Sequence, residues 1–284
     1  MLQFLADPAH FAVVAGVFGL IVGSFLNVVI HRLPIILERD WAAQCAEVRG
    51  EAAPVFEKLT LAVPRSRCPK CGHAISALEN VPVLSWLALR GRCRGCAAQI
   101  SWRYPAVEAL TGSLFAWIAT YYGFGPTALA AMLFAGMLIA LTGIDLDTQL
   151  LPDDLTLPLL GLGIAGAGFG WTGVPLADAA GGAFAGYGGL WLLAYSYKKL
   201  RGVEGMGEGD FKLLAGLGAL LGWQLLPSIV LLASAVGAVV GIGLIAFGCH
   251  KREVPIPFGT YLVGGGLAAM FFGRQLTAWW FPTL

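Results

Sequence analysis

Eight long apolar runs divide this sequence, and only a lipid bilayer can solvate a chain that carries so many. Most of the runs approach the ~20 residues that a helix needs to cross a ~30 Å hydrocarbon core. Charged residues make up 12% of the 284-residue chain, about half the share of an ordinary soluble domain. The sequence therefore predicts an all-α polytopic membrane protein with about eight transmembrane helices. The predicted spans are His10–Ile30, Pro105–Phe124, Pro126–Ile144, Leu155–Thr172, Pro175–Tyr197, Phe211–Leu226, Pro227–Cys249 and Ile256–Phe272.

Lysine and arginine lie almost entirely on one side of these spans. If the first span ends in the cytoplasm, the polar insert from His31 to Tyr104 is cytoplasmic and holds 11 of the 18 basic residues. Six more fall on the same side, and only Arg274 falls on the other. The positive-inside rule therefore favours a cytoplasmic insert. A net charge of +1 gives no overall field that would attract nucleic acid.

Four cysteines in the insert have the spacing of a zinc site. Cys68 and Cys71 form one C-x2-C pair, and Cys93 and Cys96 form a second pair after a gap of 21 residues. Each pair can point two thiolates at one ion, and two pairs complete a tetrahedron with no open position. The sequence therefore predicts a structural Zn²⁺ that orders a small insert with little hydrophobic core of its own.

Other uses of these cysteines remain open at this point. A pair of disulfides is the main alternative, although the insert is predicted to lie in the reducing cytoplasm. His73 could be a ligand only by displacing a cysteine. Cys45 and Cys249 lack partners at ligand spacing, so we expect plain thiols there.

Acidic residues gather where two predicted spans meet the cytoplasm. Asp145 follows the third span, and Asp210 precedes the sixth within Gly207-Glu208-Gly209-Asp210. The topology puts both segments on the same membrane face, and ionisable groups there are candidates for function. Two carboxyl groups that meet in a low-dielectric site cannot both ionise, so one keeps a proton while the other acts as a base. Aspartic proteolysis requires such a pair.

Helix capping is the alternative explanation for some of these carboxylates. It explains Asp210 alone about as well as catalysis does, and it is the favoured explanation for Asp153 and Asp154. The glycines beside Asp210 carry no Cβ, so they would allow close backbone approach and leave room for an extended peptide. Taken with the topology, Asp145 and Asp210 are predicted to be catalytic.

The whole sequence resembles the type IV prepilin peptidases, the bifunctional leader peptidases and N-methyltransferases of type IV pilus and type II secretion systems. The G-x-G-D element is also similar to that of presenilin-like intramembrane aspartic proteases. The blocks that carry the resemblance occur in order along nearly the whole chain. They are Gly23-Ser24-Phe25-Leu26-Asn27-Val28, the two cysteine pairs, Arg103-Tyr104-Pro105-Ala106-Val107-Glu108, Asp145-x6-Pro152-Asp153, Gly207-x-Gly209-Asp210 and Pro257-Phe258-Gly259.

The resemblance implies that Asp145 and Asp210 form the catalytic dyad. Asp147 is the fallback for the first member, because the local D-x-D makes the alignment ambiguous by two residues. The implied reaction cuts a short basic leader from type IV prepilin or pseudopilin precursors, after a glycine, at the cytoplasmic face of the bacterial inner membrane. S-adenosylmethionine would then methylate the new N-terminus. The sequence contains no strand-G-x-G-x-x-G-helix unit, so it does not locate the methyl-donor site.

This resemblance divides the chain into three expected parts. Residues 1–31 form the first transmembrane helix, residues 32–104 the zinc-binding insert, and residues 105–284 a membrane catalytic domain of about seven helices. The expected partners are prepilin-type precursors and membrane lipid, without nucleic acid. Acidic residues near the dyad could attract the basic leader. They are Asp147, Asp153, Glu204 and Glu208.

Two other classes of function compete with the peptidase. A proton-coupled transporter also uses carboxylates near glycine-broken helices, but it would require acidic groups near mid-bilayer. A zinc-bearing assembly scaffold would use the carboxylates only as helix caps. Loss of precursor cleavage on replacing Asp145 or Asp210 would separate all three.

Overall fold

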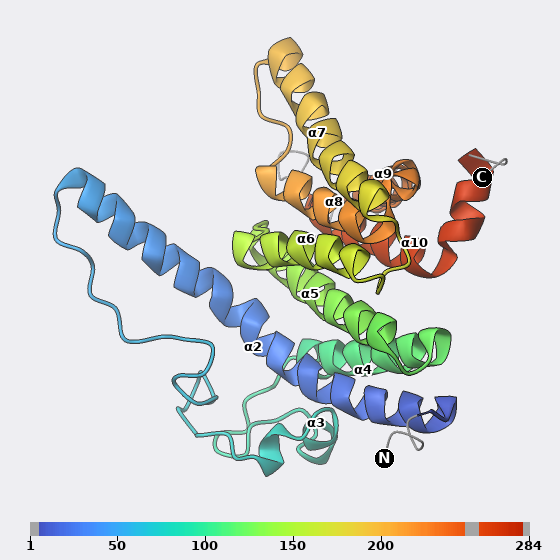
Figure 1. The fold of residues 1–284 in the computed structure, drawn as a ribbon. Coiled ribbons are helices and arrows are strands. Elements are labelled where there is room, and N and C mark those ends of the chain that lie inside the picture. The colour runs from blue at the N-terminus through green and yellow to red at the C-terminus, as the bar shows by residue number, and fades with distance from the viewer. Residues whose placement is uncertain (1–5, 248–255, 281–284) are drawn as a thin grey trace. The chain divides into compact units, whose positions relative to one another are not determined.

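The computed structural model describes residues 6–247 and 256–280, and every regular element within them is helical (Figure 1). Two isolated β-bridges, Arg67 with Ala74 and Arg92 with Gln99, are the only extended pairings in these ranges. The prediction of an all-α protein is therefore confirmed. The chain divides into two compact units, Met1–Ala128 and Leu129–Leu284.

A helix occupies the position of each of the eight predicted spans. The helices are α2 (Pro8–Arg49), α4 (Arg103–Tyr122), α5 (Pro126–Thr148), α6 (Asp153–Gly168), α7 (Leu176–Arg201), α8 (Glu208–Leu221), α9 (Leu226–Ala246) and α10 (Phe258–Trp280), with the short η1 (Leu78–Asn80), α3 (Leu84–Ala88) and η2 (Trp223–Leu225) between them. Within the described residues, three segments are long and apolar enough by themselves to cross a membrane: Pro8–Arg49, Pro126–Thr148 and Trp223–Ala246. The structure thus contains candidate membrane helices, and the count of eight spans stays a prediction.

Helix α2 continues well beyond the predicted end of the first span, through part of the expected insert to Arg49. It begins after Asp7, whose Oδ1 accepts hydrogen bonds from two backbone N–H groups of the first turn at 2.8 and 3.2 Å. The stretch after Ile30 is rich in Ala, Leu, Glu and Arg, which favour helix. The helix stops at Gly50, which takes the left-handed conformation with φ 68°. The end of the apolar run therefore marks a change of surroundings rather than the end of the helix.

In the first unit, α4 packs along α2 (Figure 1). The side chain of Asn27 joins the two helices, because its Nδ2 donates a hydrogen bond to the carbonyl oxygen of Tyr104 at 3.1 Å. The buried carboxylate of Glu108 accepts a hydrogen bond from the backbone N–H of Val83 at 2.7 Å. The insert is thereby tied to the first turns of α4. Cys45 is a free, exposed thiol, and Cys249 lies outside the described residues.

The second unit has a core of leucine and other apolar side chains contributed by helices α5 to α10. Helix α7 crosses α8 at two glycines, Gly182 and Gly218, and a Cβ on either would overlap the backbone of the other helix. Small residues of this kind let membrane helices pack at close range. The same core holds the end of α5 and the starts of α8 and α10 around one site.

Candidate active site and metal centre

Asp145 and Asp210 come from two different helices of the second unit. Asp145 lies in the last turn of α5, which ends at Thr148 because Gln149 takes the left-handed conformation with φ 55°. Asp210 lies in the first turn of α8. Both are buried, with 3% of Asp145 and 9% of Asp210 exposed. Two carboxyl groups so far from bulk water favour a state with a single negative charge.

Gly259, in the first turn of α10, lies beside both carboxyl groups. A Cβ on this residue would be 3.0 Å from Oδ2 of Asp145 and 3.2 Å from Oδ1 of Asp210. The two oxygens are therefore separated by no more than the sum of these distances. The structure thus brings the carboxyl groups of the predicted pair together against one glycine of α10, where each acts on the charge of the other.

Thr260 contacts one member of the pair only. Its backbone N–H donates to Oδ2 of Asp145 at 2.7 Å, and its Oγ1 donates to the same oxygen at 2.9 Å. The carboxyl group of Asp210 accepts no hydrogen bond from the described residues. The two carboxyl groups are therefore held differently.

Leu151, in the loop between α5 and α6, packs against the backbone on both sides of the site. A Cβ on Gly209 would lie 2.7 Å from the Cβ of Leu151, and one on Gly259 would lie 2.8 Å from its Cδ1. By contrast, a Cβ on Gly207 would meet nothing within 4 Å. Gly209 is thus required by packing, whereas the space beside Gly207 is open, as the predicted room for a peptide requires.

The other carboxylates near the pair lie elsewhere. Asp147 is exposed on α5. Residues two apart on a helix point about 200° apart, so Asp145 and Asp147 cannot both face Asp210, and the structure places Asp145 there. Asp153 and Asp154 lie in the first turn of α6, where negative charge stabilises a helix.

Two of the acidic residues expected to attract a basic leader already have a basic partner. The Nζ of Lys212 donates to both oxygens of Asp153 at 2.7 and 2.8 Å. The Nζ of Lys198 donates to Glu204 at 2.6 Å, and this raises the pKa of Lys198 and lowers that of Glu204. Asp153 and Glu204 are thereby neutralised locally, which weakens their attraction for a basic peptide.

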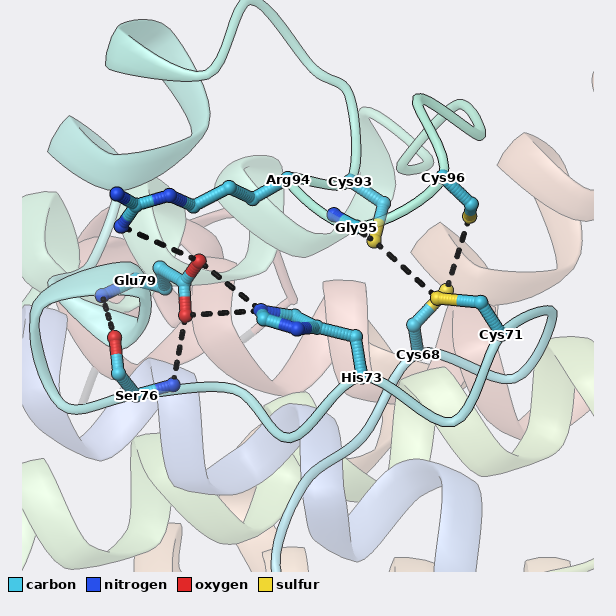
Figure 2. A network of polar contacts seen from close by, with 9 residues as sticks. All are labelled: Cys68, Cys71, His73, Ser76, Glu79, Cys93, Arg94, Gly95 and Cys96. Atoms are coloured by element: carbon cyan, nitrogen blue, oxygen red, sulfur yellow. Dashed lines mark hydrogen bonds and ion pairs between the residues drawn. The ribbon is translucent and has the colours of Figure 1, made fainter.

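In the first unit, the four insert cysteines form one cluster (Figure 2). Their Sγ atoms all lie within 4.8 Å of one another, and two of the pairs, Cys68 with Cys96 and Cys71 with Cys93, are 3.9 Å apart. A tetrahedral zinc ion with Zn–S bonds of ~2.3 Å has sulfur–sulfur edges of about 3.8 Å. A disulfide would need about 2.05 Å, so the geometry fits a metal ion and not disulfides.

Each cysteine pair lies in its own turn, and the two turns have the same backbone conformation. The N–H of Gly72 donates to the carbonyl of Cys68 at 2.9 Å, and the N–H of Ala97 donates to that of Cys93 at 2.8 Å. Gly72 and Ala97 are left-handed, with φ 71° and 55°. The turn aims backbone N–H groups at sulfur: those of Cys71 and Lys70 lower the pKa of the Cys68 thiol to about 6. This favours a thiolate at Cys68, one of the four that a zinc ion requires.

His73 does not join the cluster but belongs to a neighbouring polar network (Figure 2). Its Nε2 lies 3.2 Å from Oε1 of Glu79, which also accepts a hydrogen bond through Oε2 from the backbone N–H of Ser76 at 2.9 Å. Arg94 lies 4.0 Å from the same carboxylate. The donors from Ser76 and His73 hold the pKa of Glu79 at about 2.

The sequence did not point to Thr260, Leu151 or Glu79. Thr260 is 115 residues from Asp145 and is an ordinary residue type, so no local pattern connects the two. Leu151 is one of many leucines in the sequence, and nothing in the pattern distinguishes it. The nearest signal for Thr260 is Pro257-Phe258-Gly259, a block that precedes it directly.

Comparison with known proteins identifies two matched regions along the chain. The profile "Bacterial Peptidase A24 N-terminal domain" matches residues 17–122, and the profile "Type IV leader peptidase family" matches residues 132–242. The "Prepilin leader peptidase/N-methyltransferase" of Aeromonas salmonicida (strain A449) is 54% identical over 272 residues, which cover 94% of this chain and 92% of the relative. The chain belongs to the type IV leader peptidase family.

Proteins of the same name in other bacteria give a consistent match. The one from Stutzerimonas stutzeri is 50% identical over 97% of this chain and 96% of its own length. The one from Pseudomonas aeruginosa PAO1 is 46% identical over 98% and 96%. No solved structure matches the chain. The four-cysteine cluster lies in the part of this chain that matches the N-terminal profile, and Asp145 and Asp210 lie in the part that matches the peptidase profile.

Proposed function

We propose that this chain is a membrane aspartic endopeptidase that removes the basic leader of type IV prepilins or type II secretion pseudopilins and then methylates the new N-terminus. Membership of the family and the names of its relatives support both activities. The observation that carries the residue assignment is the approach of Asp145 and Asp210 to the same glycine, Gly259.

The chemistry follows from one proton shared by two buried carboxyl groups. The ionised member takes a proton from water as that water attacks the scissile carbonyl, and the protonated member donates its proton to the carbonyl oxygen. When the tetrahedral intermediate collapses, the first carboxyl returns its proton to the leaving nitrogen. The second takes one back from a hydroxyl of the intermediate, so the pair is regenerated.

The position of the pair suits a precursor with a charged leader and an apolar helix. Both aspartates lie at helix ends rather than in the middle of a long apolar helix. A basic leader would stay in the cytoplasm while the apolar segment behind it lies in the inner membrane, so the scissile bond would sit level with the pair. The open space at Gly207 gives an extended peptide access beside Asp210.

We also propose that Cys68, Cys71, Cys93 and Cys96 bind one structural Zn²⁺. The ion would supply four bonds that join the two cysteine turns of the insert. S-adenosylmethionine is the proposed methyl donor of the second reaction. Methylation needs a free N-terminus, so it must follow cleavage.

Mass spectrometry of a prepilin incubated with the purified full chain in lipid nanodiscs tests the proposal. Wild-type chain should release the leader, and the mature product should gain a methyl group only with S-adenosylmethionine. Asp145→Asn and Asp210→Asn should each lower the cleavage rate at least about 100-fold, while the exposed neighbour Asp147→Asn should retain it. Cleavage that survives both substitutions would refute the assignment. Proton flux into proteoliposomes without cleavage would indicate the transporter instead.

A further inference from the structure

We propose that Thr260 is a positioning residue that keeps the negative charge of the pair on Asp145 and leaves the catalytic proton on Asp210. This inference rests on the proposed peptidase function. The inference goes beyond that function because it assigns the base and the acid within a pair of chemically identical groups.

The first observation is the double contact with one oxygen. Oδ2 of Asp145 accepts both the backbone N–H of Thr260 at 2.7 Å and its hydroxyl at 2.9 Å. Hydrogen bonds to an ionised acceptor are roughly twice as strong as neutral ones. A protonated Asp145 would lose most of this advantage, so both donors favour its charged form.

The place of Thr260 in α10 adds to this preference. It is the third residue of that helix, where a backbone N–H has no acceptor within the helix. The carboxylate of Asp145 therefore takes up a donor that would otherwise be unpaired. The carboxylate of Asp145 also lies at the positive end of the dipole of α10.

The second observation is that the described residues give Asp210 no hydrogen-bond donor. Its buried carboxyl group accepts no hydrogen bond from the described residues. Lys212, the cation nearest to it in sequence, instead donates to both oxygens of Asp153. The titratable group that faces Asp210 is Asp145, whose charge opposes a second one. The proton of the pair is thus retained by Asp210.

The assignment fixes each proton transfer. Asp145 takes the proton of the attacking water and becomes neutral, and Asp210 gives its proton to the carbonyl oxygen and becomes charged. On collapse, the proton on Asp145 moves to the leaving nitrogen, and Asp210 recovers one from a hydroxyl of the intermediate. The C–N bond breaks, one water is consumed, and Asp145 is again the carboxylate bound by Thr260.

A pH profile of kcat/KM separates this assignment from its reverse. The acidic limb reports the first ionisation of the pair and the basic limb the second. Suppose that Asp145 ionises first. The Asp145 carboxylate is then present in both the singly and the doubly charged state of the pair, and losing the Thr260 hydroxyl destabilises both states equally. The acidic limb then moves to higher pH while the basic limb stays. If Asp210 ionises first, only the basic limb moves.

The variants are Thr260→Val, which removes the hydroxyl at nearly constant shape, and Thr260→Ser, which retains it. Thr156→Val is the matched control, because its buried Oγ1 in α6 of the same unit has no hydrogen-bond partner among the residues that the structure describes. Thr260→Val should move the acidic limb by about one pH unit, the equivalent of a tenfold change in an equilibrium constant. Thr260→Ser and Thr156→Val should keep the wild-type profile.

Each outcome decides the question. Movement of the basic limb, or an unmoved profile in an inserted Thr260→Val, overturns the assignment even if cleavage continues. If Thr260→Val fails to insert, Thr260→Ser and Thr260→Ala leave similar cavities and differ by the hydroxyl, so their acidic limbs must differ. A wild-type chain that does not cleave prepilin would instead overturn the proposed function.

Discussion

Gly259 faces Asp145 so closely that a Cβ on the glycine would lie 3.0 Å from Oδ2 of the carboxylate. The same Cβ would be 2.8 Å from Leu151 on its other side. Neither neighbour can retreat freely, because Oδ2 is bound by two donors of Thr260 and Leu151 packs against the core. A Cβ at this position would therefore press on the carboxylate of Asp145 as well as on the side chain of Leu151.

We expect Gly259→Ala to lower kcat for prepilin cleavage by about tenfold, since catalytic groups must be held within about 0.5 Å of their productive geometry. Gly264→Ala is the matched control in the same helix, because a Cβ there meets nothing within 4 Å. Steady-state kinetics on inserted, purified chains would check this. Equal activity of the two variants would contradict the close approach of Gly259 to the carboxyl groups.

The sequence predicts the parts of this site that follow local rules. Apolar length predicts the helices that carry Asp145 and Asp210. The order of the spans predicts that both aspartates lie on one membrane face, and charge asymmetry predicts that this face is cytoplasmic. The sequence alone does not decide between Asp145 and Asp147, because the helix phase relative to its neighbours depends on packing. Thr260 could not be predicted, since only the folded core brings α10 to the end of α5.

The same distinction applies to the insert. The C-x2-C spacing predicts four ligands because each turn is local, and the Sγ atoms do come together. The apolar run does not predict the continuation of α2 to Arg49, because it reports polarity, and the polar residues that follow Ile30 still favour helix. His73 and Glu79 form their contact through the turn that the cysteines impose.

Replacement of one cysteine in the cluster should remove the metal. Cys68→Ser or Cys96→Ser leaves three thiolates, so we expect the loss of about one zinc per chain and a loosened insert. Cys45→Ser is the control, because Cys45 is a free, exposed thiol outside the cluster. Elemental analysis of the purified chains would measure the metal. A wild-type chain without zinc would overturn the metal assignment.

Glu79 should stabilise the turn around His73 without holding the metal itself. Glu79→Gln removes the charge that draws donors from Ser76 and His73. We therefore expect faster amide hydrogen exchange across residues 73–80, with zinc content unchanged. Glu47→Gln, on the exposed end of α2, should leave exchange in that segment as in the wild type. Loss of zinc from Glu79→Gln would show that the network acts on the ligands directly.

The crossing of α7 and α8 gives a prediction about stability alone. A Cβ on Gly182 would overlap the carbonyl oxygen of Gly218 and lie 3.0 Å from the backbone nitrogen of Trp223. Because these are backbone atoms, the helices must separate, and overpacking of this kind costs about 1–3 kcal/mol. Gly189→Ala, in the same helix but with nothing within 4 Å of its added Cβ, should be neutral or slightly stabilising. Denaturant unfolding of both variants in detergent micelles would measure the difference, and equal midpoints would mean that α7 and α8 do not cross at these glycines.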